Sequence, residues 1–138
     1  NIYAPGKRPF QTIIPGFATK GGDPWLSFGV MGGDMQPQGQ AQIISNMVDF
    51  GLGVQEAGDS PRWHHGGSSE PTGEAQKGTG VLNLESGVPE ATKAALAAIG
   101  WTLAPDPGGY GGYQAIERWP GRYAAATEMR KDGVALAY

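Results

Sequence analysis

The spacing of apolar positions in the first fifty residues predicts a β-hairpin followed by a helix. Two apolar-rich runs, residues 13–19 and 25–31, are separated by Lys20-Gly-Gly-Asp-Pro24, whose glycines supply the positive φ angles that a tight reversal needs. Beyond Pro37 the apolar residues recur every three or four positions, as on one face of a helix. We therefore expect two antiparallel strands and then a helix over residues 37–50, with the proline in its first turn.

The middle of the chain predicts a short helix, a loop and one strand. Residues 54–59 are typical of a helix that ends before Pro61, because a residue preceding proline is pushed out of the helical region. Residues 62–76 are polar and rich in glycine, so we expect an exposed loop there. Residues 81–85 alternate apolar and polar side chains, which predicts a half-buried strand.

The last third of the chain predicts one helix and a second hairpin. The helix covers residues 90–99, and we expect its Leu96 and Ile99 to face the core. The hairpin joins residues 113–118 to residues 122–127 through a tight turn. The element order is then β-β-α-α-β-α-β-β. Antiparallel hairpins alternating with packed helices favour a layered α+β fold with antiparallel sheets over a doubly wound parallel sheet.

Composition and charge exclude several classes of partner. The 24 glycines and 11 prolines approach the level of disordered chains, but the periodic apolar runs and four tryptophans favour a loop-rich globular chain. The net charge is -3 and the Lys and Arg residues are scattered, so no nucleic acid is expected as a partner. No apolar stretch approaches the roughly 20 residues that span a bilayer, so no membrane partner is expected. The absence of cysteine excludes disulfides and thiolate chemistry but leaves the compartment open.

The adjacent glycines Gly32 and Gly33 are the first candidate for chemistry. They lie where a strand is expected to end and a helix to begin, so their backbone N–H groups have no regular partner. Without side chains, a substrate carbonyl can approach the backbone closely, and the positive end of the helix dipole adds to the field. These are the requirements of an oxyanion hole. The glycines alone fit a plain β-to-α turn better, because that is the commoner structure.

Seven motifs in a fixed order favour the oxyanion hole over the plain turn. Together they resemble the small subunit of the γ-glutamyltransferase (γ-glutamyltranspeptidase) family, and the resemblance covers essentially the whole chain. The segment around the glycine pair is most similar to the divergent branch of the family, which includes amidohydrolases and acylases acting on other small amides. The motifs are Arg8-Pro9, Gly32-Gly33, Val48-Asp-Phe-Gly51, Gln55-Glu-Ala57 with Asp59-Ser-Pro-Arg62, Glu85-Ser-Gly-Val-Pro89, Gly111-Gly-Tyr-Gln114, and Arg130-Lys-Asp-Gly133 continuing to Tyr138.

The resemblance implies an N-terminal nucleophile hydrolase. Such enzymes are four-layer αββα sandwiches in which a precursor cleaves itself into a large and a small subunit, and the small subunit begins with a nucleophilic Thr whose own α-amine is the base. Asn1 has no nucleophilic side chain, and Thr12 and Thr19 are internal. We therefore expect residues 1–138 to be the C-terminal portion of the small (β) subunit, not an independent domain. The expected partners are the large subunit and the N-terminal part of the small subunit.

The resemblance also implies site residues. By this match Gly32 and Gly33 hold the oxyanion through their backbone N–H groups, and the substrate is a small amide, γ-glutamyl or related. Gln11 and Thr12 occupy the positions where γ-glutamyl enzymes carry two adjacent serines that bind the substrate carboxylate. Thr12 keeps a hydroxyl, whereas Gln11 is longer and is not an equivalent ligand. No cofactor is expected.

Other polar groups are more simply explained as structural. Adjacent His64 and His65 on an extended segment point to opposite faces, so they rarely chelate one metal ion, and no metal site is expected. Arg62 follows a helix stop and is expected in a structural ion pair rather than on the substrate. The glycine-rich residues 108–112 lack the Lys and Ser or Thr of a phosphate-binding loop, so they predict a surface turn.

Two expectations concern the whole molecule. Half of a sandwich leaves one sheet face uncovered, and we expect Trp25, Phe28 and Val30 to lie on that face. The alternative to an enzyme component is a non-catalytic chain, either a degenerate family member or a Gly-rich binding module. A self-cleavage Thr in the sequence preceding residue 1 would favour the enzyme, and its absence would favour the degenerate member.

Overall fold

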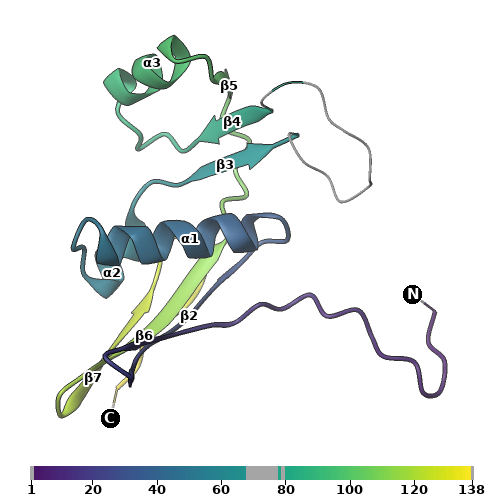
Figure 1. The fold of residues 1–138 in the computed structure, drawn as a ribbon, viewed down its shortest axis with the longest axis vertical. Coiled ribbons are helices and arrows are strands. Elements are labelled where there is room, and N and C mark those ends of the chain that lie inside the picture. Colours follow the sequence, from purple (N-terminus) through teal and green to yellow (C-terminus); the bar gives the residue numbers. More distant parts are fainter. Residues whose placement is uncertain (1, 68–77, 79, 138) are drawn as a thin grey trace.

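The computed structural model describes residues 2–67, 78 and 80–137, and its larger sheet has four antiparallel strands. Their spatial order is β1-β2-β6-β7, so each predicted hairpin forms and the two hairpins pair through β2 and β6. Figure 1 shows this sheet below the long helix. The strands are β1 (Gly16–Lys20), β2 (Asp23–Met31), β6 (Gly112–Trp119) and β7 (Arg122–Thr127).

Two helices cover one face of this sheet. Helix α1 (Met35–Val48) packs on β2, and the short helix α2 (Val54–Asp59) packs on β6 and β7, close to the predicted bounds of both helices. Between helices and sheet lies the main hydrophobic core, in which each fully buried Leu, Ile, Val or Met side chain contributes about 1.5–3 kcal/mol. Its buried members are Leu26, Val30, Ile43, Met47, Val54, Ala57, Tyr113, Ala115 and Ala126.

A second, smaller sheet lies on the other side of α1 (Figure 1). It contains β3 (Trp63–Gly66), β4 (Val81–Leu84) and β5 (Thr102–Ala104), and helix α3 (Glu90–Ala98) precedes β5. Strands β3 and β4 are antiparallel, whereas β4 and β5 are parallel. The α+β class is confirmed, but β5 and its parallel pairing were not predicted from the sequence.

The prediction of a loop over residues 62–76 is wrong at its start, where β3 forms. The backbone of β3 is held from the side by α1. The amide of Gln42 donates to the carbonyl of Trp63 and its oxygen accepts the N–H of Trp63, each at 2.9 Å. Gln38 pairs in the same way with His65, at 2.9 and 2.7 Å. The strand therefore depends on a distant helix, and residues 68–77 of the predicted loop lie outside the described residues.

Two predictions about side-chain burial are also wrong. Val30 is 2% exposed beneath α1, and Trp25 and Phe28 are partly buried against the same core, so none of the three is left uncovered. The open face carries Met31 and Ile116 instead, about half exposed. The faces alternate along a strand, so the error is one of choosing which face the helices cover.

Helix α3 is the second case. Ile99 follows its last turn with 76% of its surface exposed, although we expected this residue in the core. Leu96 is only partly buried, and α3 has no fully buried residue. The helix packs against the short strand β5 at the margin of the small sheet, and no second layer of described residues covers its outer side.

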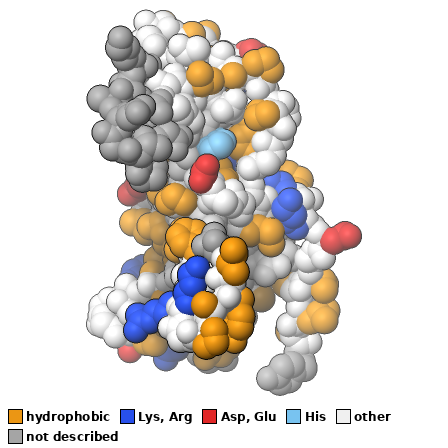
Figure 2. Space-filling model, turned by 90° about the vertical axis from the view of Figure 1, so that its right-hand side faces the viewer, with side chains coloured by type: hydrophobic (Ala, Val, Ile, Leu, Met, Phe, Trp, Pro, Cys, Tyr) orange, Lys and Arg blue, Asp and Glu red, His pale blue; other side chains and the backbone are white. Residues whose placement is uncertain are grey.

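Residues 2–15 precede β1 and form an extended N-terminal arm that leaves the body of the molecule (Figure 1). Its apolar side chains Ile2, Tyr3 and Phe10 are each more than three quarters exposed. On the face shown in Figure 2, Lys and Arg side chains occur in small separate groups among hydrophobic ones, without a continuous basic stripe. Within the described residues, no helix is both long and apolar enough to cross a bilayer.

Candidate functional site

The Gly32-Gly33 pair forms the turn between β2 and α1. Both residues have positive φ, 128° at Gly32 and 58° at Gly33. Their carbonyl oxygens accept the first N–H groups of the helix, from Met35 at 3.1 Å and from Gln36 at 3.0 Å. Neither glycine N–H has a hydrogen-bond acceptor among the residues that the structure describes. These two donors are free to bind a ligand, at the positive end of α1.

The two glycines are required for different reasons. A Cβ on Gly32 would lie 3.0 Å from the Cα of Gly111 and 3.3 Å from the Cβ of Met35, so this position is closed by packing as well as by its φ. A Cβ on Gly33 would meet nothing within 4 Å, so only its φ excludes most side chains. A Cβ on Gly111 would lie 2.4 Å from the carbonyl oxygen of Met31. The loop before β6 therefore presses directly on the turn.

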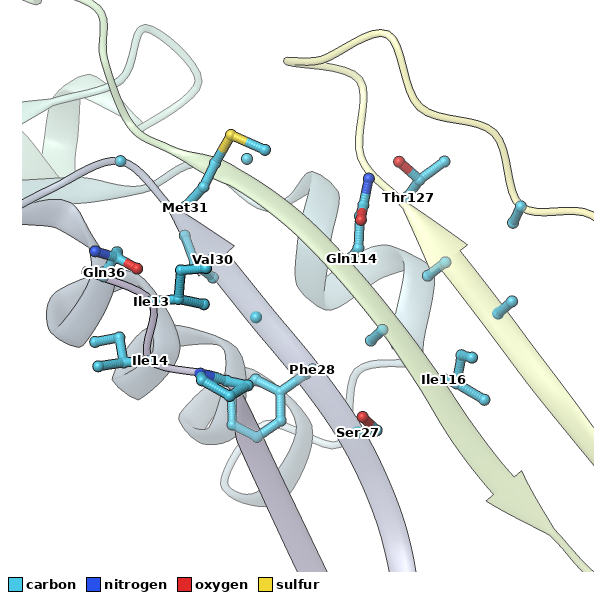
Figure 3. A pocket seen from close by; sticks show the side chains of 18 of the residues that line it. Ile13, Ile14, Ser27, Phe28, Val30, Met31, Gln36, Gln114, Ile116 and Thr127 are labelled. Atoms are coloured by element: carbon cyan, nitrogen blue, oxygen red, sulfur yellow. The ribbon is translucent and has the colours of Figure 1, made fainter. Parts of the chain in front are cut away.

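A cleft of about 850 Å³ opens beside this turn (Figure 3). It runs along β2, β6 and β7 and is bounded by the N-terminal arm on one side and by residues 134–136 on the other. Both glycines line it. None of the described residues that line the cleft carries a charged side chain; polar groups come from Thr12, Ser27, Gln36, Gln114 and Thr127. The cleft can therefore surround a small uncharged group next to two backbone donors.

Residues 12–15, which we call the cleft wall, bring one predicted site residue beside the glycine pair. Thr12 lines the cleft, and its carbonyl accepts a hydrogen bond of 2.9 Å from the side-chain amide of Gln36. Gln36 also donates its own N–H to Gly33. Gln11 is placed differently: its amide donates to the carbonyl of Ile13 at 3.0 Å, and its side chain is not part of the cleft lining. The structure thus joins Thr12 to the glycine turn but turns the Gln11 amide to its own backbone.

Four polar residues of the cleft, Ser27, Gln36, Gln114 and Thr127, were not predicted as site residues. Gln114 and Thr127 are paired across β6 and β7, and Figure 3 shows their side chains side by side on the open sheet face. The hydroxyl oxygen of Thr127 is buried without a hydrogen-bond partner among the described residues. A Cβ on Gly133 would lie 2.2 Å from that oxygen, so the C-terminal segment passes directly over it. Gln114 is the last residue of one of the seven motifs, and this was the sequence signal that could have identified it as a site residue.

Arg62 belongs to a buried charge cluster outside the cleft lining, as predicted. Its guanidinium is 1% exposed, donates to the carbonyls of Tyr110 at 2.8 Å and Gly58 at 3.0 Å, and lies 3.4 Å from the carboxylate of Glu128. Arg130 bridges the same carboxylate to that of Glu85. The positive charges of the two arginines are therefore balanced by the two carboxylates of Glu85 and Glu128. The cluster connects the end of β4 to the segment after β7.

Burial and pairing act in opposite directions on these arginines. Burial lowers the pKa of Arg62, and neighbouring Arg130 lowers it further, against the attraction of Glu128 and Glu85. Burial also lowers the pKa of Arg130, but hydrogen bonds to Glu85 and Glu128 outweigh it and raise the pKa above its usual value. An arginine in such a pair stays charged throughout the working pH range.

The remaining candidates have structural surroundings. His65 packs its ring edge-on against Trp101, with centroids 5.5 Å apart. Within the described ranges, no three or more His, Asp or Glu side chains are grouped so that they could hold a metal ion. The prediction of a surface turn over residues 108–112 holds for Gly108 and Gly109, which are exposed, and the N–H of Gly108 donates to the carboxylate of Asp106 at 2.8 Å. It is wrong for the second half, because Tyr110 is 4% exposed and Gly112 begins β6.

Comparison with known proteins gives matches over the whole chain. The family model described as Gamma-glutamyltranspeptidase matches residues 1–138. The Acylase ACY 1 proenzyme of Pseudomonas sp. (strain SE83) is 35% identical over 136 residues, covering 97% of this chain and 22% of that protein. The Oxamate amidohydrolase proenzyme of Klebsiella pneumoniae is 34% identical over 139 residues, covering 98% of this chain and 25% of that protein.

A solved structure agrees with these matches. The cephalosporin acylase of Bacillus halodurans superposes with a TM-score of 0.78 at 40% identity, covering 99% of this chain and 24% of that one. The chain thus spans about a quarter or less of the length of these relatives.

Proposed function

Because the chain belongs to the γ-glutamyltranspeptidase family, we propose that it supplies the oxyanion hole of an enzyme that cleaves or transfers the acyl group of a small amide. Its α+β fold is part of the sandwich of N-terminal nucleophile hydrolases, as predicted. The observation that carries the proposal is that Gly32 and Gly33 line the cleft and that their N–H groups are unpaired within the described residues. The same observation supports an active enzyme over a degenerate relative or a binding module.

The proposed reaction uses a Thr hydroxyl from the preceding segment of the same precursor. Its oxygen attacks the amide carbonyl while the α-amine of that Thr takes the proton. The carbonyl oxygen becomes an oxyanion, held by the N–H groups of Gly32 and Gly33; removing one such donor costs roughly 3–4 kcal/mol in other hydrolases. The C–N bond then breaks, the leaving amine takes the proton, and water or an amine releases the acyl group from the Thr.

The direct test is to express the full precursor and to assay the purified protein on a panel of small amides. We expect a large and a small fragment, with a Thr at the N-terminus of the small one, and turnover of at least one amide. A precursor that stays uncut and hydrolyses no amide would leave the degenerate relative as the better explanation.

We further propose that this chain is the C-terminal portion of the small subunit and works with the large subunit and the rest of the small one. The open sheet face, with half-exposed Met31 and Ile116, and the apolar side chains of the extended arm support this arrangement because both lack cover. Residues 1–138 expressed alone should therefore not give a stable monomer of 14.4 kDa in ultracentrifugation. A monodisperse monomer of that mass would argue against the missing partner.

The substrate should differ from a γ-glutamyl group. A γ-glutamyl substrate carries an α-carboxylate, and the described cleft lining offers Thr12 but no paired serines and no cation. We expect the assembled enzyme to hydrolyse γ-glutamyl anilides poorly compared with smaller or differently charged amides. Relatives named acylase and oxamate amidohydrolase, matched over nearly the whole chain, support this direction.

The matching variant is Gln11→Ser with Thr12→Ser. It should raise kcat/KM for γ-glutamyl anilides if these positions contact the substrate. Unchanged relative rates across the amide panel would mean that other parts of the precursor set the specificity.

A further inference from the structure

We propose that Gln11, Gln36 and Gln40 are positioning residues that hold the cleft wall, and with it Thr12, in register with the oxyanion glycines. This inference rests on the proposed function and adds residues that set how the substrate is held. Three successive carbonyls of the wall each accept a glutamine amide. Gln36 donates to Thr12 at 2.9 Å, Gln11 donates to Ile13 at 3.0 Å, and Gln40 donates to Ile14.

The wall needs such anchors because little else holds it. Within the described residues it forms no strand pairing until β1 begins at Gly16, and Ile13 is 66% exposed. A Cβ on Gly16 would lie 2.5 Å from the ring of Phe28, so the chain enters the sheet in direct contact with that ring. Among the described residues before Gly16, the side-chain amides of the three glutamines are the polar groups that hold the wall. Figure 3 shows Gln36 next to Ile13 and Ile14.

Gln36 connects the wall to the oxyanion turn in a single residue. Its backbone N–H donates to the carbonyl of Gly33, and its side chain donates to the carbonyl of Thr12. Gln40 lies one helical turn after Gln36 and donates to the carbonyl of Ile14. The two glutamines therefore share one face of α1. The distance from Thr12 to the glycine N–H groups is therefore fixed by α1 and not by the arm itself.

Helix α1 also supplies the matched control. Gln38 and Gln42 have the same spacing and the same chemistry, but they lie on another side of the helix and bind the backbone of β3. Neither lines the cleft, so loss of Gln42 should disturb the small sheet without moving the wall. Gln42 therefore separates an effect on substrate position from a general effect of removing a glutamine from α1.

The experiment uses the full processed enzyme and compares Gln36→Met with Gln40→Met, made together, against Gln42→Met. Methionine keeps the length and helix preference of glutamine but cannot donate. The wall holds the substrate in the ground and transition states alike, so KM for the preferred amide should rise about fivefold or more, with kcat changed less than about twofold. Hydrogen exchange over residues 11–16 should become faster. Gln42→Met should change neither.

The outcomes separate this inference from the proposed function. An unchanged KM and unchanged exchange in the double variant would overturn the inference, as would an equal rise of KM in Gln42→Met. A wild-type enzyme that turns over no amide would contradict the proposed function instead. The exchange measurement would still decide the placement of the wall, with faster exchange supporting it and unchanged exchange refuting it.

Discussion

Replacing Gly33 with proline should reduce amide hydrolysis by the assembled enzyme at least about a hundredfold, because proline removes one of the two N–H donors outright. The loss should appear in kcat and in kcat/KM alike, since the oxyanion exists only in the transition state. The measurement is steady-state kinetics on the preferred amide, together with the thermal transition and subunit association of the same variant. Activity lost from a protein that still folds and assembles would support the assignment.

Two controls separate the donor from the backbone. Proline also forces a negative φ on a residue at 58°, so Gly33→Ala tests the strain alone: alanine is strained there too, but it keeps its N–H and its Cβ meets nothing within 4 Å. We expect Gly33→Ala to retain activity within about tenfold of the wild type. Gly108→Pro places the same substitution at a φ of 74° in the surface turn and should leave kcat unchanged. Equal losses in the Ala and Pro variants of Gly33 would refute the role of the donor.

Removing the guanidinium of Arg62 should be the most destabilising single change outside the cleft. Arg62→Leu leaves the buried carboxylate of Glu128 with Arg130 as its one cationic partner among the described residues. It also removes the guanidinium donor to the carbonyl of Tyr110 and leaves the carbonyl of Gly58 with Arg130 as its remaining side-chain donor. Breaking a buried ion pair from one side costs about 3–5 kcal/mol. Denaturant unfolding of the assembled protein should show this loss of unfolding free energy.

Graded variants keep this prediction testable if Arg62→Leu does not assemble. Arg62→Lys retains the charge but not the fork of donors, so its loss should be intermediate. Lys93→Ala breaks the exposed pair with Glu90, whose carboxylate is 87% exposed, and should cost less than about 1 kcal/mol. An Arg62→Leu protein within about 1 kcal/mol of the wild type would show that the cluster contributes little.

The elements with strong local signals could be predicted from the sequence. The two hairpins, α1 and α2 follow from glycine turns and from the period of apolar residues, signals that lie within each segment. Strand β3 could not be found in this way. Its sequence Trp63-His-His-Gly66 has no apolar alternation, and its backbone is held by glutamines more than twenty residues earlier in the chain.

In the candidate site too, local sequence signals were visible and tertiary contacts were not. The glycine turn was visible because the end of a strand, two glycines and the start of a helix are adjacent in sequence. Which sheet face is covered depends on how α1 packs, so Val30 was placed on the wrong side. Gln36 and Thr127 reach the cleft through tertiary contacts that no local pattern records.

The most direct measurement of the oxyanion hole is a crystal structure of the assembled enzyme with a slowly hydrolysed amide bound at the nucleophilic Thr. We expect the N–H groups of Gly32 and Gly33 both to point at the former carbonyl oxygen, with N···O distances of about 2.7–3.1 Å. A structure in which that oxygen is held elsewhere, while both glycine N–H groups are bonded to protein acceptors, would contradict the oxyanion hole.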